Sequence, residues 1–196
     1  MKLKRSLILM FFTGFAILSQ GQDSWAIDQS NSSIQFKIGH LLISSINGGF
    51  NDFTAQIMPE KENSFDHAKL ESVIKVESID TGNNQRDKHL LQSDFFEVNS
   101  FPEITFNNAT LVFTNEDSFQ VSGDLSIKSV TKRVTFNGTF GGYAEMWGQE
   151  RAGFSAIGKI NRFDFGISFN DTLDSGGLVV GEEVTFILNL EFVKQN

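Results

Sequence analysis

The sequence predicts an all-β protein, an eight-stranded antiparallel β-barrel with one short helical excursion near residues 84–97. About eight segments alternate apolar and polar residues with a period of two in the roughly 175 residues after the first 21. No repeating βα pattern interrupts them, which favours antiparallel pairing. Small residues also recur in phase with the apolar ones, and they favour a barrel over a sandwich because they leave interior space and let strands coil. These small residues are Gly123, Gly138, Ala156 and Gly158.

The first 21 residues predict a cleaved secretory signal peptide that is separate from the barrel. Residues 1–5 carry three basic groups, residues 7–18 form an apolar run, and Ser19 and Gly21 are small residues suited to a signal peptidase. The run is too short and wrongly flanked for a stable membrane span, although an uncleaved anchor is the alternative. We therefore expect a periplasmic or secreted protein.

Residues 22–196 are expected to form a single barrel domain, held together by its core alone. Removal of the leader lowers Lys plus Arg from 16 to 13 against 24 Asp plus Glu, a formal charge of about −11. Such a charge disfavours nucleic acid or an anionic membrane surface as a partner. The chain has no cysteine, which excludes disulfides, a lipoprotein anchor and cysteine-based zinc or redox chemistry.

The first strands are expected before residue 80. A strand at residues 33–40 has one apolar face, formed by Ile34, Phe36, Ile38 and His40. Residues 50–58 and 69–79 show the same alternation, and the two glycines at 48 and 49 indicate a turn or kink.

The helical excursion follows a turn cluster at residues 81–84. Asn84 with Asp87 three positions later resembles a helix N-cap with its acidic partner, and residues 93–94 suggest a second turn. The chain then returns to a strand after Pro102. The excursion would therefore lie across one end of the barrel as a connection and a lid, with apolar side chains available to line the mouth. These are Leu90, Leu91, Phe95 and Phe96.

Five strands are expected after Pro102. They span residues 103–114, 119–127, 133–143, 153–160 and 183–194. A slip of phase near residues 108–110 indicates a β-bulge in the first of them. The last has the clearest alternation, because five inward-facing apolar residues follow at every second position: Val184, Phe186, Leu188, Leu190 and Phe192.

Several motifs occur in an order that resembles the YceI-like family of exported lipid- or polyisoprenoid-binding proteins. They are WAID at 25–28, RDKHL at 86–90, FPEITF at 101–106, GDLSI at 123–127 and NRFDFG at 161–166. The resemblance extends from Trp25 to Phe192. It departs from the family at Ser129, where glycine is frequent, and at Asn161, where aspartate is usual. It implies a lipocalin-like barrel with an elongated apolar cavity for an isoprenoid or fatty-acyl chain.

Nine apolar residues are candidates for the wall of that cavity. They are Phe36, Ile38, Phe106, Phe113, Val121, Leu125, Phe136, Phe154 and Phe186. Periodicity alone favours the alternative that they fill a solid core, and the resemblance shifts the interpretation to a cavity.

A second set of candidates would form the mouth, the lid and a head-group contact. Its members are His40, Arg86, His89, Leu90, Phe95, Phe96 and Arg162. Arg86 and His89 can share a helix face and meet a phosphate or other polar head group. An internal salt bridge is the favoured alternative, with Asp87 capping the helix and Arg86 pinning it. Arg162 is likewise expected to pair structurally with Asp164, and His40 to be a buried, hydrogen-bonded structural residue.

We expect a non-enzymatic protein that carries or sequesters a polyisoprenoid, an isoprenoid quinone or a fatty-acid derivative, with no other cofactor. The sequence has no G-x-S-x-G motif and no closely spaced metal-binding histidines. A surface-acting interaction or stress-protection module with a filled barrel is one alternative. A hydrolase or isomerase that brings Arg86, His89 and Asp164 into one wet cleft is another. No stable membrane insertion is expected after signal cleavage. The sequence allows a homodimer but does not decide the oligomeric state.

Overall fold

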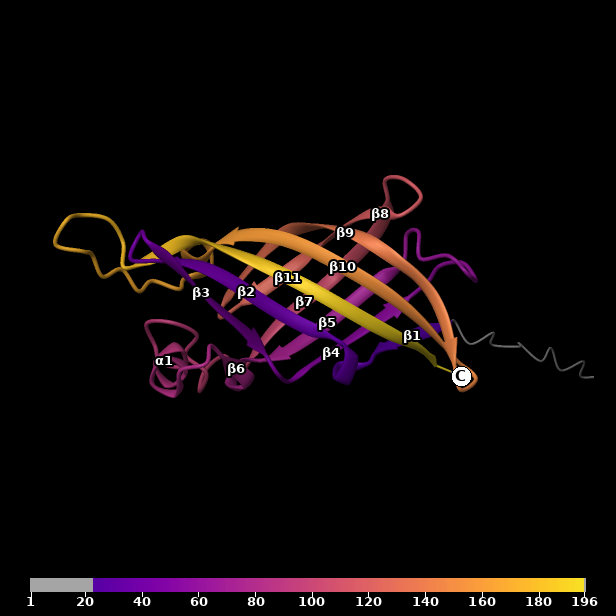
Figure 1. Cartoon of the computed structure of the whole chain (residues 1–196), viewed down its shortest axis with the longest axis horizontal. Helices are drawn as coiled ribbons and strands as arrows, with labels where there is room; N and C mark the ends of the chain where they lie inside the picture. Colours follow the sequence, from indigo (N-terminus) through magenta and orange to yellow (C-terminus); the bar gives the residue numbers. More distant parts are fainter. Residues whose placement is uncertain (1–22, 196) are drawn as a thin grey trace, which may run out of the picture.

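The computed structural model describes residues 23–195, which form a closed eight-stranded antiparallel barrel (Figure 1). The predicted fold class is confirmed. Three of the eight strands of the barrel are each broken into two segments, so the single sheet contains eleven strand segments. The segments are β1 (Ser24–Ile27), β2 (Ser33–His40), β3 (Ser44–Phe50), β4 (Phe53–Met58), β5 (Lys69–Lys75), β6 (Ile79–Asp80), β7 (Glu103–Phe113), β8 (Ser118–Ile127), β9 (Val130–Met146), β10 (Gln149–Asn161) and β11 (Val180–Gln195). The expected signal peptide at residues 1–21 lies outside the described residues.

Closure depends on β11, which pairs with β10 on one side and with both β2 and β1 on the other. Between β1 and β2 the chain forms one 3-10 turn, η1 (Gln29–Asn31), whose N-cap is Asp28. Arg151 on β10 links Asp28 to Glu191 on β11 through its Nη1 atom. This ion cluster ties the first and last strands together at the seam of the barrel.

The glycines at 48 and 49 lie inside β3, so the prediction of a turn there is wrong. Gly48 instead faces the ring of Phe36, and a Cβ atom at this position would lie 2.5 Å from Phe36 Cζ. The actual turn comes earlier, between β2 and β3, and contains Leu41 and Leu42 in left-handed conformations (φ 54° and 62°). Large apolar residues rarely adopt this backbone conformation, which is why sequence pattern does not indicate it.

The in-phase glycines do not leave open interior space, which corrects the sequence interpretation. Phenylalanine rings occupy the room above them. A Cβ atom at Gly123 would lie 2.7 Å from Phe106 Cζ, and one at Gly158 would overlap the ring of Phe136. These glycines therefore let large rings from the neighbouring strand lie flat over them, which is how the barrel holds so many aromatic residues.

The expected bulge in β7 is confirmed, since its register with β8 shifts between Asn107 and Thr110. The helical excursion is also present, although its helix, α1 (Asn84–Leu90), is shorter than residues 84–97. Its N-cap is Asn83 and not Asn84, because the Asn83 side chain accepts hydrogen bonds from the backbone N–H groups of Gln85 and Arg86. Turns continue the segment to residue 100.

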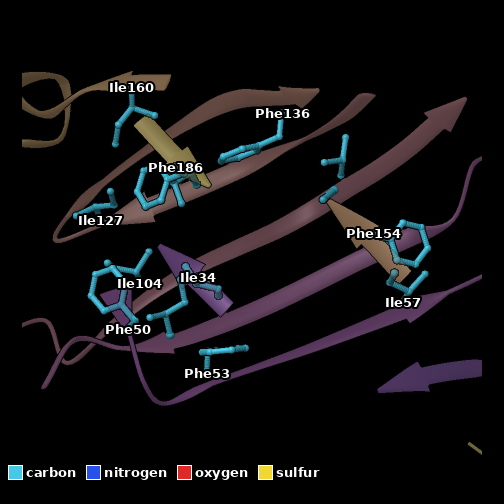
Figure 2. Close-up of a cluster of buried hydrophobic side chains, with 14 of the residues drawn as sticks. Ile34, Phe50, Phe53, Ile57, Ile104, Ile127, Phe136, Phe154, Ile160 and Phe186 are labelled. Atoms are coloured by element: carbon cyan, nitrogen blue, oxygen red, sulfur yellow. The ribbon is translucent and has the colours of Figure 1, made fainter. Parts of the chain in front are cut away.

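The barrel interior is a continuous apolar core in which side chains from opposite walls point toward one another (Figure 2). Phe136 on β9 enters from one side in this view, and Phe53 on β4 from the other. At the end that holds β1, aromatic rings close the interior, with Phe65 packed against Trp25 and Phe154 at centroid distances of 5.2 and 5.0 Å. Within residues 23–195 no helix is long and apolar enough to cross a membrane.

Candidate functional site

Two adjoining cavities occupy the interior of the barrel. The outer cavity, of about 240 Å³, lies at the end that carries α1, and the inner cavity, of about 90 Å³, lies deeper. Ile104 and Phe186 line both, and their side chains are drawn in Figure 2. An apolar protein cavity of about 150 Å³ stays dry and holds a benzene molecule. The outer cavity is larger, so it has room for a segment of an apolar chain.

Eight of the nine predicted wall residues line these cavities. Phe36, Ile38 and Phe186 line the outer cavity, and Phe186 recurs at the inner one. The remaining inner residues share inward positions on the long strands: Phe106, Val121, Leu125, Phe136 and Phe154. Phe113 lines neither cavity. It lies at the end of β7, beyond the inner cavity, where its ring packs against Phe119 and Phe140.

All seven predicted mouth and lid residues line the outer cavity. They come from four separate parts of the chain and are His40, Arg86, His89, Leu90, Phe95, Phe96 and Arg162. His40 lies at the end of β2, Arg162 begins the 3-10 helix η3 (Arg162–Phe165), and the others belong to α1 and the turns after it. Figure 1 shows α1 at the end of the barrel opposite the C-terminus.

The segment after α1 is held across this end by contacts to two other loops. Lys128, in the β8–β9 turn, donates from Nζ to the carbonyl oxygen of Ser93 at 3.2 Å. The backbone N–H of Phe169 donates to the carbonyl oxygen of Asp94 at 3.2 Å. The Phe95 ring stacks on Phe169 at 4.9 Å. These contacts make the segment a cover for the outer cavity that is attached at several points.

Arg86 does not form the predicted salt bridge. Its Nε donates to Thr81 Oγ1 and its Nη2 to the Thr81 carbonyl oxygen, each at 2.7 Å. Asp87 accepts hydrogen bonds from the Thr81 hydroxyl and backbone N–H and does not cap the helix. Thr81 therefore anchors the first turn of α1 to the end of β6, and the guanidinium of Arg86 is left with a neutral partner.

Arg162 is almost completely buried, with 2% of its surface exposed. Its three nitrogens donate to the carbonyl oxygens of Gly181, Ile167 and Val180 at 2.8 to 3.0 Å. Burial lowers the pKa of this guanidinium from its usual value. The expected pair with Asp164 does not form, because Asp164 faces outward and pairs with Lys132 at 2.9 Å.

The ionisable side chains that line the outer cavity are basic. Among the described residues that line the outer cavity, Arg86 and Arg162 are cationic, His40 and His89 are ionisable, and none is Asp or Glu. His89 pairs with Asp94 at 2.8 Å. The His40 ring makes no hydrogen bond or ion pair within residues 23–195, so the prediction of a hydrogen-bonded structural histidine is wrong. The lining of the mouth thus offers basic groups to a polar head group, with Asp94 engaged by His89.

The β2–β3 turn forms part of the rim of this mouth. The backbone N–H of Leu41 donates to the Val179 carbonyl oxygen at 2.9 Å, and Val179 lines the outer cavity. Leu42 and Ile43 point away from the core, with 73% and 85% of their surfaces exposed. Left-handed conformations cost a non-glycine residue roughly 1–2 kcal/mol each, so this turn is strained.

Twelve residues that line the outer cavity were not among the predicted site residues. Four of them follow the predicted inward phase of their strands and could have been found: Ile104, Ile127, Ile160 and Val184. Others come from the long connection between η3 and β11, including Ile167, Phe169 and Val179. That connection has no periodicity, so the sequence carries no signal that it folds back over the cavity.

Comparison with known proteins agrees with this arrangement. The YceI-like domain matches residues 25–192. The chain belongs to the YceI-like family. A relative in Staphylococcus epidermidis, UPF0312 protein SERP2314, is 40% identical over 171 residues, which cover 86% of this chain and 96% of that protein.

Two solved structures of similar proteins have the same barrel. The YCEI protein of Campylobacter jejuni is 32% identical, with a TM-score of 0.67 over 82% of this chain and 91% of that one. A polyisoprenoid-binding domain from Saccharophagus degradans, implicated in plant cell wall breakdown, is 16% identical. Its TM-score is 0.62, and the match covers 86% of this chain and 97% of that domain. At 16% identity, this second likeness establishes the fold and nothing further.

Proposed function

We propose that this protein is an exported, non-enzymatic carrier that holds the apolar tail of a long-chain amphiphile inside its barrel. The observation that carries the proposal is the pair of adjoining apolar cavities beneath a cover of lid residues. A polyisoprenoid, an isoprenoid quinone or a fatty-acid derivative has the required shape. Membership of the YceI-like family and the polyisoprenoid-binding domain of similar fold support this class of ligand.

The energetics favour a chain-like apolar ligand. Each buried methylene contributes about 0.8 kcal/mol, so a tail of ~20 carbons contributes ~16 kcal/mol before ordering and association costs are subtracted. Such a ligand needs few polar contacts. Its head group would lie at the mouth, near Arg86, His89, His40 and Arg162, where no carboxylate lines the cavity.

Two other functions are less well supported. A surface-acting module with a filled barrel does not require an internal space as large as the outer cavity. A hydrolase or isomerase would need Arg86, His89 and Asp164 in one cleft, whereas Asp164 pairs with Lys132 and does not line the outer cavity. No group of three His, Asp or Glu residues that could hold a metal ion occurs within residues 23–195.

Export is part of the proposal and rests on the sequence of residues 1–21. Mass spectrometry of the mature protein, isolated from the envelope or the medium of its own host, measures both the location and the cleavage site. We expect a mature N-terminus at or near Gln22. An intact N-terminus in the cytoplasmic fraction would contradict export and leave the binding proposal standing.

Native mass spectrometry, followed by organic extraction, tests ligand binding. We expect a co-purified long-chain lipid and saturable binding when geranylgeraniol is titrated into delipidated protein. The variant Ile38→Trp places a bulky ring in the outer cavity and should abolish binding. Its matched control is Lys37→Trp, because Lys37 is the exposed neighbour on the same strand. Recovery of apoprotein alone, with no binding of polyprenyl or fatty-acyl compounds, would refute the carrier function.

A further inference from the structure

Large apolar side chains are exposed at two hairpin turns, one at each end of the barrel. Leu42 and Ile43 form the tip of the β2–β3 turn, and Trp147 forms the tip of the β9–β10 turn with 87% of its surface exposed. Single exposed apolar residues are common on soluble proteins and need no explanation. The β9–β10 turn also exposes the adjacent Met146, at 45%. The β2–β3 turn differs because Leu42 and Ile43 lie beside the mouth of the cavity.

The backbone of the β2–β3 turn is unfavourable for the residues it contains. Leu41 and Leu42 have φ angles of 54° and 62°, at positions where Asn-Gly or Asp-Gly is usual. The β9–β10 turn also has two residues with positive φ angles, but only one of them, Trp147, is large. The other is Gly148, which adopts this conformation without strain. Strain of this kind, at residues whose side chains do not fill the core, indicates a role for the side chains themselves.

This turn is continuous with the mouth. His40, immediately before it, lines the outer cavity, and Leu41 is hydrogen-bonded to Val179, which also lines it. The Leu42 side chain packs against Gly177 of the neighbouring loop, where a Cβ atom would lie 2.9 Å from Leu42 Cδ1. A surface that covers Leu42 and Ile43 would therefore lie against the opening of the cavity.

The expected ligand determines which surface this is. A long apolar tail leaves the barrel very slowly if it must first dissolve in water, because burial of each methylene favours the bound state. A bilayer placed against the mouth removes that barrier. The formal charge, about −11 without residues 1–21, and the exposed carboxylates of Asp171 and Asp174 in the adjoining loop disfavour a strongly anionic surface.

We propose that Leu42 and Ile43 insert into the apolar surface of a neutral lipid bilayer and dock the cavity mouth there while ligand is loaded or released. This inference rests on the proposed carrier function. Two apolar side chains give a weak, reversible contact, which suits transient docking.

Transfer kinetics test the docking. The protein is loaded with anthroyloxy-stearate, a fluorescent fatty acid, and mixed with phosphatidylcholine vesicles that contain a quenching lipid. If transfer occurs in a docked complex, its rate rises with vesicle concentration. The double variant Leu42→Ser/Ile43→Ser should transfer the probe at about one tenth of the wild-type rate or more slowly. Its transfer rate should depend little on vesicle concentration. Its equilibrium affinity for the probe should be unchanged, because neither residue lines the cavity.

Trp147→Ser is the matched control, because it removes an equally exposed apolar residue from the hairpin at the other end. It should transfer the probe at the wild-type rate. Because the contact is apolar, 0.5 M salt should not abolish transfer from the wild-type protein. A wild-type rate that is independent of vesicle concentration, or an equal loss in Trp147→Ser, would overturn the docking proposal while the carrier function stands.

A second measurement needs no bound ligand and covers the case in which the probe does not bind. In a Trp147→Phe background, Leu42→Trp places a reporter at the tip. Vesicles of brominated phosphatidylcholine should quench this reporter, and they should not quench Trp147 of the wild-type protein. Absence of quenching at position 42 would refute docking to a bilayer, and failure of the probe to bind would count only against fatty acids as ligands.

Discussion

The two ends of the barrel interior are built from the same strands but differ in what they contain. At the end beside β1 the cavity measures about 90 Å³, and the ring of Phe154 contacts Phe65, Phe119, Phe140 and Phe192. At the end beside α1 the cavity measures about 240 Å³ and is bordered by two guanidinium groups. The end beside β1 is filled by packed aromatic rings, and the end beside α1 contains the larger cavity.

The difference comes from the segments that cover each end and not from the strands. Phe65, from the loop between β4 and β5, enters the closed end and contacts four aromatic rings, including Trp25 and Tyr143. At the open end, the residues after α1 lie over the cavity and are held by a few loop contacts. An alternating strand pattern therefore specifies the wall, and the capacity of the barrel depends on how the connections fill its ends.

The largest effect is expected from Phe65→Ala, which removes the ring that closes the packed end. Phe65 is 3% exposed, and loss of a buried phenylalanine costs about 3–5 kcal/mol in the free energy of unfolding. Urea denaturation measures this loss. Phe96→Ala, at the open end, should cost clearly less because Phe96 is only partly buried. Equal losses would show that the two ends are packed alike.

The second effect concerns the ring stacked against Gly158. Gly158→Ala should destabilise the barrel by about 1–3 kcal/mol, because the new Cβ atom overlaps the Phe136 ring and forces it to shift within the packed core. Gly153→Ala is the matched control on the same strand, since its Cβ atom would meet nothing within 4 Å. It should be neutral or slightly stabilising. Thermal unfolding of the two variants should separate them, and equal melting temperatures would contradict the packing argument.

The lid gives the third effect, on ligand release. Phe95→Ala and Phe96→Ala should each raise the dissociation rate of a bound polyprenyl compound about tenfold, because a ring that covers the outer cavity is lost. Arg86→Lys should change this rate less, since the positive charge is kept. Stopped-flow displacement measures all three. If the three variants retain ligand equally well, the residues after α1 are a connection and not a lid.

The smallest effect is expected at the seam. Hydrogen bonds from the side chains of Ser30 and Arg151 hold the pKa of Asp28 well below its usual range. The charged form is therefore favoured in the folded state, and its contribution is present at neutral pH and is lost as the pH falls below about 4. Asp28→Asn should lower stability at pH 7 by about 1 kcal/mol.

The difference in melting temperature between the wild type and Asp28→Asn should narrow as the pH is lowered from 6 toward 2, as linkage between protonation and folding requires. A series of thermal melting curves measures it. A difference that stays constant over this range would mean that the carboxylate charge contributes nothing at the seam.

Much of the wall could be predicted from the sequence because a period of two depends only on which face of a strand is buried. Eight of the nine wall candidates line a cavity for this reason. Phe113 has the right phase, but it lies at the strand end beyond the inner cavity. The partners of Arg86 and Arg162 are backbone carbonyl and hydroxyl oxygens, which every sequence offers, so no spacing of charges could identify them. The strained turn at Leu41 and Leu42 could not be predicted either, since leucine rarely adopts the left-handed conformation that both residues have there.

The pairing of β11 with β1, β2 and β10 also governs how the chain can fold. The first strand pairs with the last as well as with β4, so the contact that closes the ring joins opposite ends of the sequence. Contacts of such separation form late and slowly, because the entropy of closing a long loop must be overcome first. A chain still emerging from the ribosome has no β11 and cannot close its barrel. It therefore remains an unclosed sheet, with the edges of β1 and β2 that pair with β11 unprotected, until synthesis is nearly complete.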